Sequence, residues 1–317
     1  MTALTRNTHF CPGETWLDTD GKPIQAHGGG VLYENGTYYW FGENKDNDTR
    51  NERIDIIGVS CYSSRDLLNW KNEGVVLPAV PDDLQHDLHP GKVAERPKVI
   101  YNRTTKTYVM WLHVDSADYL AARAGVAVSD KVTGPYTYLG SIRPNNRDSR
   151  DMTLFQDDDG RAYLIHSSDW NSVTLISDLT DDYLSTTGHY SRQFDHEIKN
   201  TGRESPALFK HEGRYFIITS GTTGWFPNAA EYAAADSIHG PWRVIGNPCV
   251  GDNAALTFHS QDTFVLPVAD KPGKFIFMAD RWNKDDLRDS RYVWLPLEVN
   301  GEQLTLKWSD SWSLNEL

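Results

Sequence analysis

One arrangement of polar and apolar positions recurs five times along the chain. Its first copy spans residues 30–42, where two apolar runs flank the dipeptide Asn35-Gly36. Asn-Gly between two such runs predicts a tight turn, so the segment is predicted to form two antiparallel strands. Repetition at this scale is typical of a fold built from equivalent units. The other copies span residues 97–113, 152–166, 206–219 and 263–279.

A second pair of strand-like runs follows each copy, beginning with residues 57–62 and 74–77. Five units of four short antiparallel strands predict an all-β fold, a five-bladed β-propeller. A β-sandwich would account for the strands but not for five matched double hairpins, and no stretch shows helical periodicity. We expect residues 1–317 to form one propeller domain, with the N-terminal Thr15-Trp16 segment completing the last blade. The second pairs of the other units lie at residues 125–129 and 134–138, 173–177 and 183–184, 231–235 and 240–244, and 292–295 and 304–306.

Polar residues precede the inner strands at a nearly constant distance. The first strand of each blade lines the propeller axis, so the residues just before these strands converge at one end of the axis. Counting back five residues from the apolar run leads to His27, Glu95, Glu204 and Gln261 in four units. In the third unit the acidic residue, Asp151, lies only four positions back. Because a shift of one residue reverses the face of an ideal strand, we expect Asp151 to lie at a bulge or a frayed strand end.

Composition narrows the range of partners. The net charge of −13 argues against nucleic acid, because phosphate binding requires clustered Lys and Arg. The 11 Trp and 15 Tyr suit a surface that stacks on flat ligands. No run approaches the ~20 apolar residues of a membrane span, and the first ten residues lack the apolar segment of a signal peptide. We expect a cytoplasmic protein, or a secreted one if a signal peptide has been removed, with no membrane partner; no pattern indicates an oligomeric state.

The sequence contains no motif for a cofactor or a metal. Cys11, Cys61 and Cys249 are far apart and form neither a metal spacing nor a disulfide framework. His86-x-x-His89 lacks a third ligand at zinc spacing. Because a phosphate loop and a dinucleotide fingerprint are also missing, we expect no cofactor and no metal.

Several carboxylates around one channel, with Trp and Tyr nearby and no nucleophilic triad, indicate glycoside chemistry. Glycosidases pair a protonated carboxyl, which donates to the leaving oxygen, with a carboxylate that activates water or attacks carbon. Burial and a neighbouring negative charge raise the pKa of such an acid. Glu204 is the candidate acid, because Asp151 and Glu95 are its expected neighbours. From the residues alone, Glu95 is also the candidate base.

Seven short motifs, distributed over nearly the whole chain, are informative together. They are residues 26–30 (AHGGG), 38–44 (YYWFGEN), 95–100 (ERPKVI), 150–153 (RDMT), 204–206 (ESP), 223–225 (TGW) and 260–262 (SQD). With these motifs the chain resembles glycoside hydrolase family 43, and within it the subfamily of exo-β-1,3-galactanases. Because the catalytic domain of that family is a five-bladed propeller, the resemblance implies the same fold as the repeats.

The resemblance also implies catalytic roles. It implies an acid at Glu204, a modulating carboxylate at Asp151 and, at Gln261, a glutamine that holds the water. The aspartate base that most of the family carries before the first inner strand falls at Gly28, and its absence is characteristic of the subfamily. An amide is a poor base, so Gln261 would need an imidic tautomer to act as one. Inversion at the anomeric carbon is implied as well, and it requires room for a water between acid and base.

Further residues are candidates for binding the substrate. By resemblance, Glu95, Glu43 and Tyr119 contact sugar hydroxyls. Trp225 follows the fourth hairpin and suits stacking on a galactose face, although core packing would explain it equally well from the residues alone. The other substrate-binding candidates are Thr222, Asn228 and His27.

We therefore expect an inverting, exo-acting glycoside hydrolase that releases galactose from β-1,3-galactan, the arabinogalactan backbone, or from galacto-oligosaccharides. An α-L-arabinofuranosidase or a β-galactosidase of the same family is an alternative that differs in pocket shape. A carbohydrate-binding propeller without turnover is a third possibility, because the usual base is missing. The position of Glu204 argues against it, since a lectin needs no acid.

Overall fold

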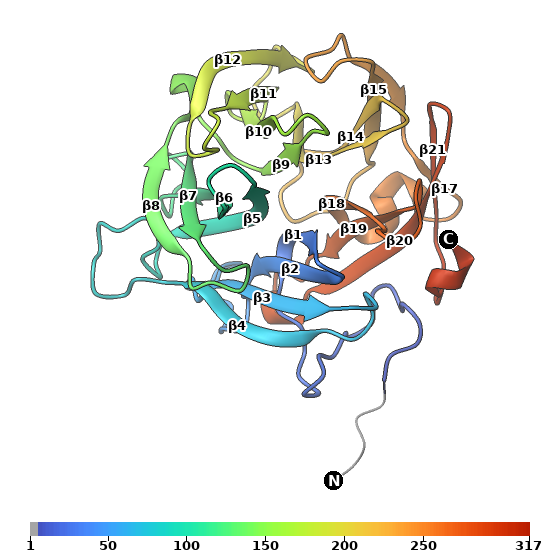
Figure 1. Ribbon diagram of the computed structural model, residues 1–317, viewed down its shortest axis with the longest axis horizontal. Helices are drawn as coiled ribbons and strands as arrows, with labels where there is room; N and C mark the ends of the chain where they lie inside the picture. The colour runs from blue at the N-terminus through green and yellow to red at the C-terminus, as the bar shows by residue number, and fades with distance from the viewer. Residues whose placement is uncertain (1–5) are drawn as a thin grey trace.

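The computed structural model describes residues 6–317 of the protein. These residues form five sheets arranged in a ring, antiparallel except for one short parallel strand in the fifth, as Figure 1 shows in a view down the shortest axis of the molecule. In each sheet the first strand lies next to the centre of the ring and the last lies at the rim, so each sheet is one blade of a β-propeller. The predicted fold class is confirmed. The expectation about a signal peptide concerns in part residues 1–5, which lie outside the described residues.

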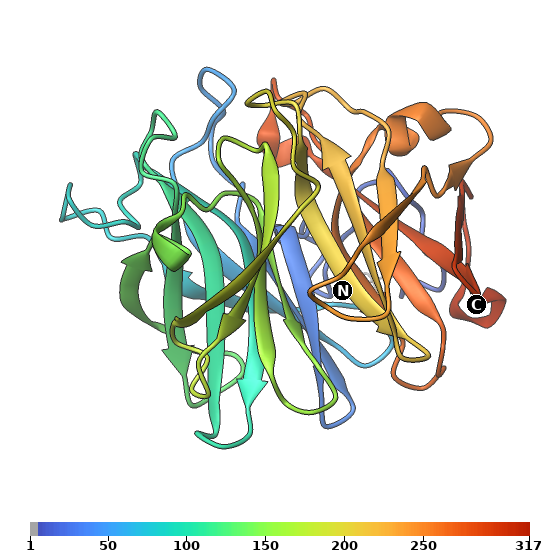
Figure 2. The ribbon, with the colours of Figure 1, turned by 90° about the horizontal axis from the view of Figure 1, so that it is seen from above.

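The strands of the five blades follow one another along the chain, and Figure 2 shows them running between the two ends of the ring. Blade 1 contains β1 (His27–Glu34), β2 (Thr37–Glu43), β3 (Gly58–Ser64) and β4 (Lys71–Pro78). Blade 2 contains β5 (Val93–Asn102), β6 (Thr107–Asp115), β7 (Arg123–Ser129) and β8 (Thr137–Ile142). Blade 3 contains β9 (Met152–Gln156), β10 (Ala162–Ser168), β11 (Val173–Leu179) and β12 (Thr186–Gln193). Blade 4 contains β13 (Arg203–His211), β14 (Arg214–Gly221), β15 (Glu231–Ala235) and β16 (Arg243–Gly246). Blade 5 contains β18 (Gln261–Pro267), β19 (Phe275–Arg281), β20 (Arg291–Asn300) and β21 (Gln303–Lys307), with the short β17 (Cys249–Val250) parallel to β21.

Inner hairpins agree with the sequence pattern better than outer strands do. Asn35 and Gly36 both have positive φ, 49° and 79°, as the predicted two-residue turn between β1 and β2 requires. The outer strand of blade 3 was expected at residues 183–184, but these residues lie in a turn and β12 begins at Thr186. Most side chains of β12 are polar and partly exposed, so the strand has no apolar alternation that would reveal it.

The hydrophobic core is divided into five clusters, and each lies between two adjacent blades. The middle strands contribute to two clusters at once. In β14, Phe216 packs toward blade 5 while Ile217 packs toward blade 3, because successive side chains of a strand point to opposite faces of the sheet. The blades are therefore held to one another by side chains, and the first strands are positioned around the axis by this packing.

The N-terminal segment closes the ring, but not as a strand of the last blade. Phe10 and Trp312 exchange backbone hydrogen bonds of 2.8 and 3.1 Å, and their rings stack with centroids 4.1 Å apart. Trp16 packs against the aromatic cluster between blades 5 and 1. The expectation that Thr15-Trp16 completes blade 5 is wrong, because β17 already pairs with the outer edge of β21. The segment instead covers the junction between the last and first blades.

Short 3-10 helices are the remaining regular elements. No helix within residues 6–317 combines the length and the apolar character needed to cross a membrane. The 3-10 helices are η1 (Pro144–Asn146), η2 (Ala254–His259), η3 (Leu287–Asp289) and η4 (Leu314–Glu316).

Candidate active site

In four of the five blades a β-bulge adds one residue to the first strand shortly after the predicted site residue. In blades 1, 2 and 4 the residue that follows the site position has a left-handed conformation. These residues are Gly28, Arg96 and Ser205, with φ of 58°, 54° and 58°. Because a bulge bends its strand and re-aims the neighbouring side chains, these strands can begin with polar residues at the axis and continue with regular apolar pairing.

Blade 3 has no such bulge. Asp151 directly precedes β9, and its carbonyl accepts a hydrogen bond from the backbone N–H of Ser167 (2.9 Å), so pairing continues in register. The site residue of this blade therefore lies four positions before the apolar run. In the other blades, where the bulge adds one residue, it lies five positions before the run. Asp151 lies at a strand end, but this end is paired and not frayed, and the bulge alternative is wrong because the bulges lie in the other four blades.

Gly28 stands where the resemblance places a missing aspartate, and the structure explains why no side chain is found there. The residue has φ of 58°, and a Cβ would lie 2.2 Å from Oε1 of Glu43. Glu43 occupies this corner from the second strand: Oε1 accepts from the backbone N–H of Arg96 (2.9 Å) and Oε2 pairs with Nζ of Lys45 (2.6 Å). Burial raises the pKa of Glu43 against the opposing effect of Lys45.

A pocket of about 400 Å³ opens where the first strands begin. Its volume lies within the range of small-molecule sites. Seven of the predicted residues line it: Glu43, Glu95, Tyr119, Asp151, Glu204, Trp225 and Gln261.

Glu204 is a carboxyl bonded only to neutral donors. Its Oε1 accepts from Nε2 of Gln261 and its Oε2 from Nδ2 of Asn171, each at 3.0 Å. Burial, and then the negative charge of Asp151, raise the pKa of Glu204 to about 8, although Arg96 acts in the opposite direction. At neutral pH the side chain is therefore a protonated acid.

Gln261 uses every hydrogen-bonding position of its amide. Its Oε1 accepts from Nη2 of Arg96 (2.6 Å) and from Nε1 of Trp282 (3.1 Å). Its Nε2 donates to Glu204 (3.0 Å) and to Oγ of Ser220 (2.9 Å). Because Arg and Trp side chains can only donate, these partners fix which amide atom is the oxygen. The group is held as an ordinary amide against the carboxyl of Glu204.

Arg96 lines the pocket and connects three blades. Its Nε pairs with Oδ2 of Asp151 (3.0 Å), and its Nη1 donates to the carbonyl of Asp262 (3.1 Å). With its contact to Gln261, this guanidinium joins blades 2, 3 and 5 through one side chain. The fixed fork of an Arg suits such a multiple contact better than a Lys would. Arg96 was not singled out from the sequence.

Glu95 has a charged partner. His113, opposite Glu95 in the β5–β6 pair, has Nδ1 at 3.3 Å from Oε2 of Glu95 and Nε2 at 3.0 Å from Oδ2 of Asp115. Although burial alone would lower it, hydrogen bonds to Asp115 and Glu95 raise the pKa of His113 to about 9. Burial opposes ionisation of Glu95 as well, but His113, Lys45 and Tyr119 together lower its pKa to about 2. Glu95 is therefore ionised throughout the neutral range.

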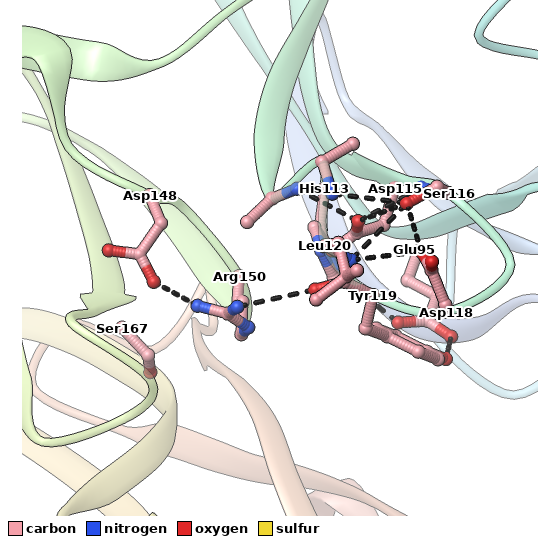
Figure 3. Close-up of polar contacts among 12 residues, drawn as sticks. Glu95, His113, Asp115, Ser116, Asp118, Tyr119, Leu120, Asp148, Arg150 and Ser167 are labelled. Carbon is pink, nitrogen blue, oxygen red and sulfur yellow. Dashed lines mark hydrogen bonds and ion pairs between the residues drawn. The ribbon is translucent and has the colours of Figure 1, made fainter. Parts of the chain in front are cut away.

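A loop that starts at Asp115 positions Tyr119, as Figure 3 shows. Oδ1 of Asp115 accepts from the backbone N–H groups of Ser116 (2.9 Å) and Ala122 (2.8 Å), and Tyr119 Oη donates to Oε1 of Glu95 (2.9 Å). Arg150 reaches the carbonyl of Tyr119 (3.3 Å) from blade 3. Asp115 thus supports both the charge on His113 and the loop that carries the tyrosine.

Trp225 and Trp282 form the aromatic part of the pocket wall. Their ring centroids are 5.7 Å apart at an interplanar angle of 69°, and both line the pocket. Trp225 is therefore placed for stacking and not buried in the core, so the core-packing alternative is wrong.

Glu95, His113 and Asp151 offer donor atoms within 4.8 Å of one another, a spacing that a metal ion could use. Both nitrogens of His113 are engaged by carboxylates, which requires both protons. Asp151 is paired with Arg96. The group is an ion-pair network and does not suit a metal.

Comparison with known proteins agrees with this geometry. The model of the family described as "Glycosyl hydrolases family 43" matches residues 25–263. The chain belongs to glycosyl hydrolase family 43. A β-D-galactofuranosidase of Aspergillus niger is 28% identical over 226 residues, and a xylan 1,3-β-xylosidase of a Vibrio species is 23% identical over 280 residues. These matches cover 65% and 80% of this chain but only 64% and 50% of the two relatives.

Solved structures of the family are similar over nearly the whole chain. A β-1,3-galactosidase of family 43 in complex with galactodeoxynojirimycin is 42% identical, with a TM-score of 0.89 over 96% of this chain and 100% of that one. An exo-β-1,3-galactanase of Phanerochaete chrysosporium with β-1,3-galactotriose is 39% identical, with a TM-score of 0.88 over 97% of this chain and 68% of that one. An exo-β-1,3-galactanase of Clostridium thermocellum is 36% identical, with a TM-score of 0.85 over 96% and 66%.

Three predicted residues of this family 43 chain do not face the pocket. His27 is fully buried, with Nδ1 at 3.0 Å from Asp280 and Nε2 at 3.3 Å from the hydroxyl of Tyr292, so it supports the pocket floor and does not contact a ligand. The amide of Asn228 is bonded on both sides to the backbone of Gly221 (2.7 and 2.9 Å), which closes the loop that carries Trp225.

Thr222 is the third of these residues. Its hydroxyl donates to the carbonyl of Asn200 (2.6 Å), which ties the Trp225 loop to the segment before β13. Thr222 and Asn228 therefore shape the loop from behind. The expectation that His27 binds substrate directly is wrong, because its ring is fully buried. For Thr222 and Asn228, which do not line the pocket of about 400 Å³, it stays a prediction.

Several residues of the site were not found from the sequence. Lys45 directly follows the motif at residues 38–44, and Arg96 lies inside the motif at residues 95–100, so inspection of the charged neighbours of Glu43 and Glu95 would have found them. Arg150 lies inside the motif at residues 150–153, five positions before Phe155, but was not assigned to the site. Asn171 and Trp282 reach the pocket from the segments after β10 and β19, and their spacing along the chain gives no sign of it.

Proposed function

We propose that this family 43 chain is an inverting exo-β-1,3-galactanase, which removes terminal galactose from β-1,3-galactan or galacto-oligosaccharides. One observation carries the proposal. Glu204 is a pocket carboxyl whose pKa is raised to about 8 by burial and by Asp151, which is the state that a glycosidase acid requires. The similarity of nearly the whole chain to a β-1,3-galactosidase and to an exo-β-1,3-galactanase supports the choice of galactose as the sugar.

Glu204 donates its proton to the glycosidic oxygen of the leaving chain. Its two accepted hydrogen bonds hold the carboxyl plane, and its O–H remains free to point into the pocket. Asp151 raises the pKa of Glu204 by its charge, and Arg96 holds the Asp151 carboxylate in place through an ion pair. The acid is therefore loaded at neutral pH and becomes depleted as the pH rises through about 8.

Inversion requires a water on the opposite face of the sugar. Gln261 has no free hydrogen-bonding position in this arrangement, so holding the water requires it to exchange one of its four contacts. An imidic tautomer would also place a proton on Oε1, toward the donors of Arg96 and Trp282. We therefore assign Gln261 the role of positioning Glu204 and the water, and not that of a base. The proton that the attacking water loses then passes to a solvent water, or to Glu95 if the test below identifies Glu95 as the base.

Glu95 carries the negative charge in the pocket, because Gln261 is a neutral amide. It is ionised, and it lines the same pocket with Tyr119 and Glu43. We assign these three residues to sugar hydroxyls. Glu95→Gln tests the assignment: a rise in KM with kcat nearly retained supports binding, whereas loss of kcat with unchanged affinity makes Glu95 the base.

A single experiment tests the function. Incubation with β-1,3-galactan, followed by NMR from the first turnovers, should release galactose with the α-anomer formed first. Formation of the β-anomer first would reject inversion, and release of arabinose from arabinosylated substrates would identify an arabinofuranosidase. Binding without release would favour the lectin alternative, which the glycine at position 28 keeps open.

A further inference from the structure

A second cluster of chemically active side chains lies far from the pocket. Asp178 is near the end of β11, His189 is in β12, and His239 is in the turn between β15 and β16. Oδ1 of Asp178 is 2.7 Å from Nε2 of His239, and Oδ2 is 3.1 Å from Nδ1 of His189. One nitrogen of each ring and one oxygen of the carboxylate lie within 4.8 Å of one another. Because the pocket lies where the first strands begin, and β11 runs from that end toward the other, the cluster belongs to the opposite end of the propeller.

Local backbone features bring these residues together. The pairing of β11 with β12 is irregular between Ser177 and Leu179, which leaves Asp178 at the bulge. A bulge turns a side chain out of the regular alternation. Gly188, with φ of 94°, directly precedes His189 and has no atom near its Cβ position. Neither feature is needed for a regular outer strand.

His239 is held in place from the neighbouring blade. Nε2 of Gln193 donates to its carbonyl (3.0 Å), and Oγ of Ser191 lies 2.9 Å from its Nδ1. With Nδ1 engaged by a hydroxyl, Nε2 is the nitrogen that faces Asp178. A histidine whose second nitrogen is hydrogen-bonded in this way is typical of metal sites, since that bond fixes the ring orientation and the tautomer.

We propose that Asp178, His189 and His239 bind a divalent transition metal, with zinc as the best match. Two imidazoles and one carboxylate form a donor set that suits zinc, and imidazole ligands exclude magnesium and calcium as preferred occupants. His189 is 65% exposed, so the ion keeps a coordination position for water. The neighbouring cation, Arg161, is paired with Asp159 (2.7 Å) and leaves the Asp178 carboxylate available.

The bound ion connects the outer strand of blade 3 to the outer turn of blade 4. Within residues 6–317, adjacent blades share no backbone hydrogen-bonded strand pair, because each of the five sheets is separate. A metal bridge at the rim therefore adds a link that the sheets themselves lack. Its effect is on stability and not on the reaction, and the inference does not depend on the proposed function.

Zinc titration of tag-free protein, first stripped with a chelator, tests the site. Calorimetry should give one equivalent bound, and the thermal unfolding midpoint should rise on zinc addition, because a ligand that binds only the folded state stabilises it. His189→Ala should weaken zinc affinity at least about tenfold and abolish the shift in the midpoint. This exposed substitution should not disturb folding, and Asp178→Asn should act in the same direction.

His196→Ala is the matched control, because it removes an exposed histidine just beyond β12 that lies outside the cluster. It should retain full zinc binding. Equal affinity of the wild type and His189→Ala would overturn the proposal, since zinc would then bind elsewhere. Absence of binding to the wild type would also overturn it and leave the three residues as a hydrogen-bonded link between blades.

Discussion

Glu95 and Glu204 occupy the same position in blades 2 and 4, yet they are built for opposite charge states. Each begins the inner part of its strand and is followed by a bulge residue with positive φ, Arg96 or Ser205. The residue opposite Glu95 in the second strand is His113, whereas the residue opposite Glu204 is Ser220. The pKa of Glu95 is lowered to about 2 and that of Glu204 is raised to about 8.

The difference shows that the propeller supplies positions and that the cross-strand and inter-blade neighbours supply the chemistry. A buried imidazolium beside one carboxylate stabilises its charge. Burial and a second carboxylate, Asp151, beside the other stabilise its proton, against the opposing effects of Arg96 and the Gln261 amide. A repeat fold can therefore produce an acid and an anion from one structural position, as each blade varies the facing residue.

Glu204→Gln gives the largest expected effect. The amide keeps the shape and accepts hydrogen bonds but has no proton to donate, so kcat/KM on β-1,3-galactan should fall about 10²–10⁴-fold. Galactose binding, measured by calorimetry, should change much less. Glu212→Gln is the matched control, because this exposed glutamate lies in the turn at the other end of the β13–β14 hairpin. A loss smaller than tenfold for Glu204→Gln would remove it from the role of acid.

Asp151→Asn should bring the pKa of Glu204 closer to that of Glu95. The Asp151 charge raises the pKa of Glu204, and its loss also frees Arg96, which lowers that pKa. The alkaline limb of the pH–rate profile should therefore move from near 8 to lower pH, by about one unit or more, with reduced activity at neutral pH. Asp159→Asn, in the turn between β9 and β10, should leave the profile unchanged. An alkaline limb that stays in place would mean that Asp151 does not act on Glu204 by charge.

The repeated pattern predicted the five blades and the position of the site residues at one end of the propeller axis. Both depend on how apolar and polar residues are arranged within a single hairpin. The turn at Asn35-Gly36 is encoded by two residues, and Glu204, Asp151 and Gln261 by their distance from apolar runs. The outer strand β12 was misplaced, since its polar, partly exposed residues carry no alternation. His189 of that strand was consequently not considered.

The charge states could not be predicted, because they depend on register and inter-blade contacts. His113 affects Glu95 only through the pairing of β5 with β6, which the bulge at Arg96 sets. Asn171 reaches Glu204 from another blade, 33 positions earlier in the chain. His27 shares the strand position of Glu95 but is turned onto Asp280, so position alone did not decide which residues face the ligand.

Asp115→Asn should make Glu95 easier to protonate without changing the pKa of Glu204. With an amide at this position His113 loses one of the two carboxylates that raise its pKa, so the charge beside Glu95 falls and the pKa of Glu95 rises from about 2. KM should increase several-fold, mainly at mildly acidic pH, with a small change in kcat and no shift of the alkaline limb. In a Glu95→Gln background the same substitution should have little further effect on KM. Additive losses would show that Asp115 acts only through the Tyr119 loop.

The smallest expected effect is on how the stability of the wild type, compared with Asp115→Asn, depends on pH. This comparison reports on the protonation of His113 alone. Its pKa is about 9 in the folded protein against an ordinary value of 6.5, so its contribution is fully present below pH 6.5 and is lost as the pH rises through about 9. The raised pKa of Glu204 also affects stability, but wild type and Asp115→Asn share that term and it cancels in their difference. Urea unfolding should show the wild type more stable by an amount that declines, on the order of 1 kcal/mol, between these pH values. A difference that stays constant would mean that His113 is neutral in the folded protein. The contrast between Glu95 and Glu204 would then require another source of positive charge, and Lys45 is the remaining cation that lowers the pKa of Glu95.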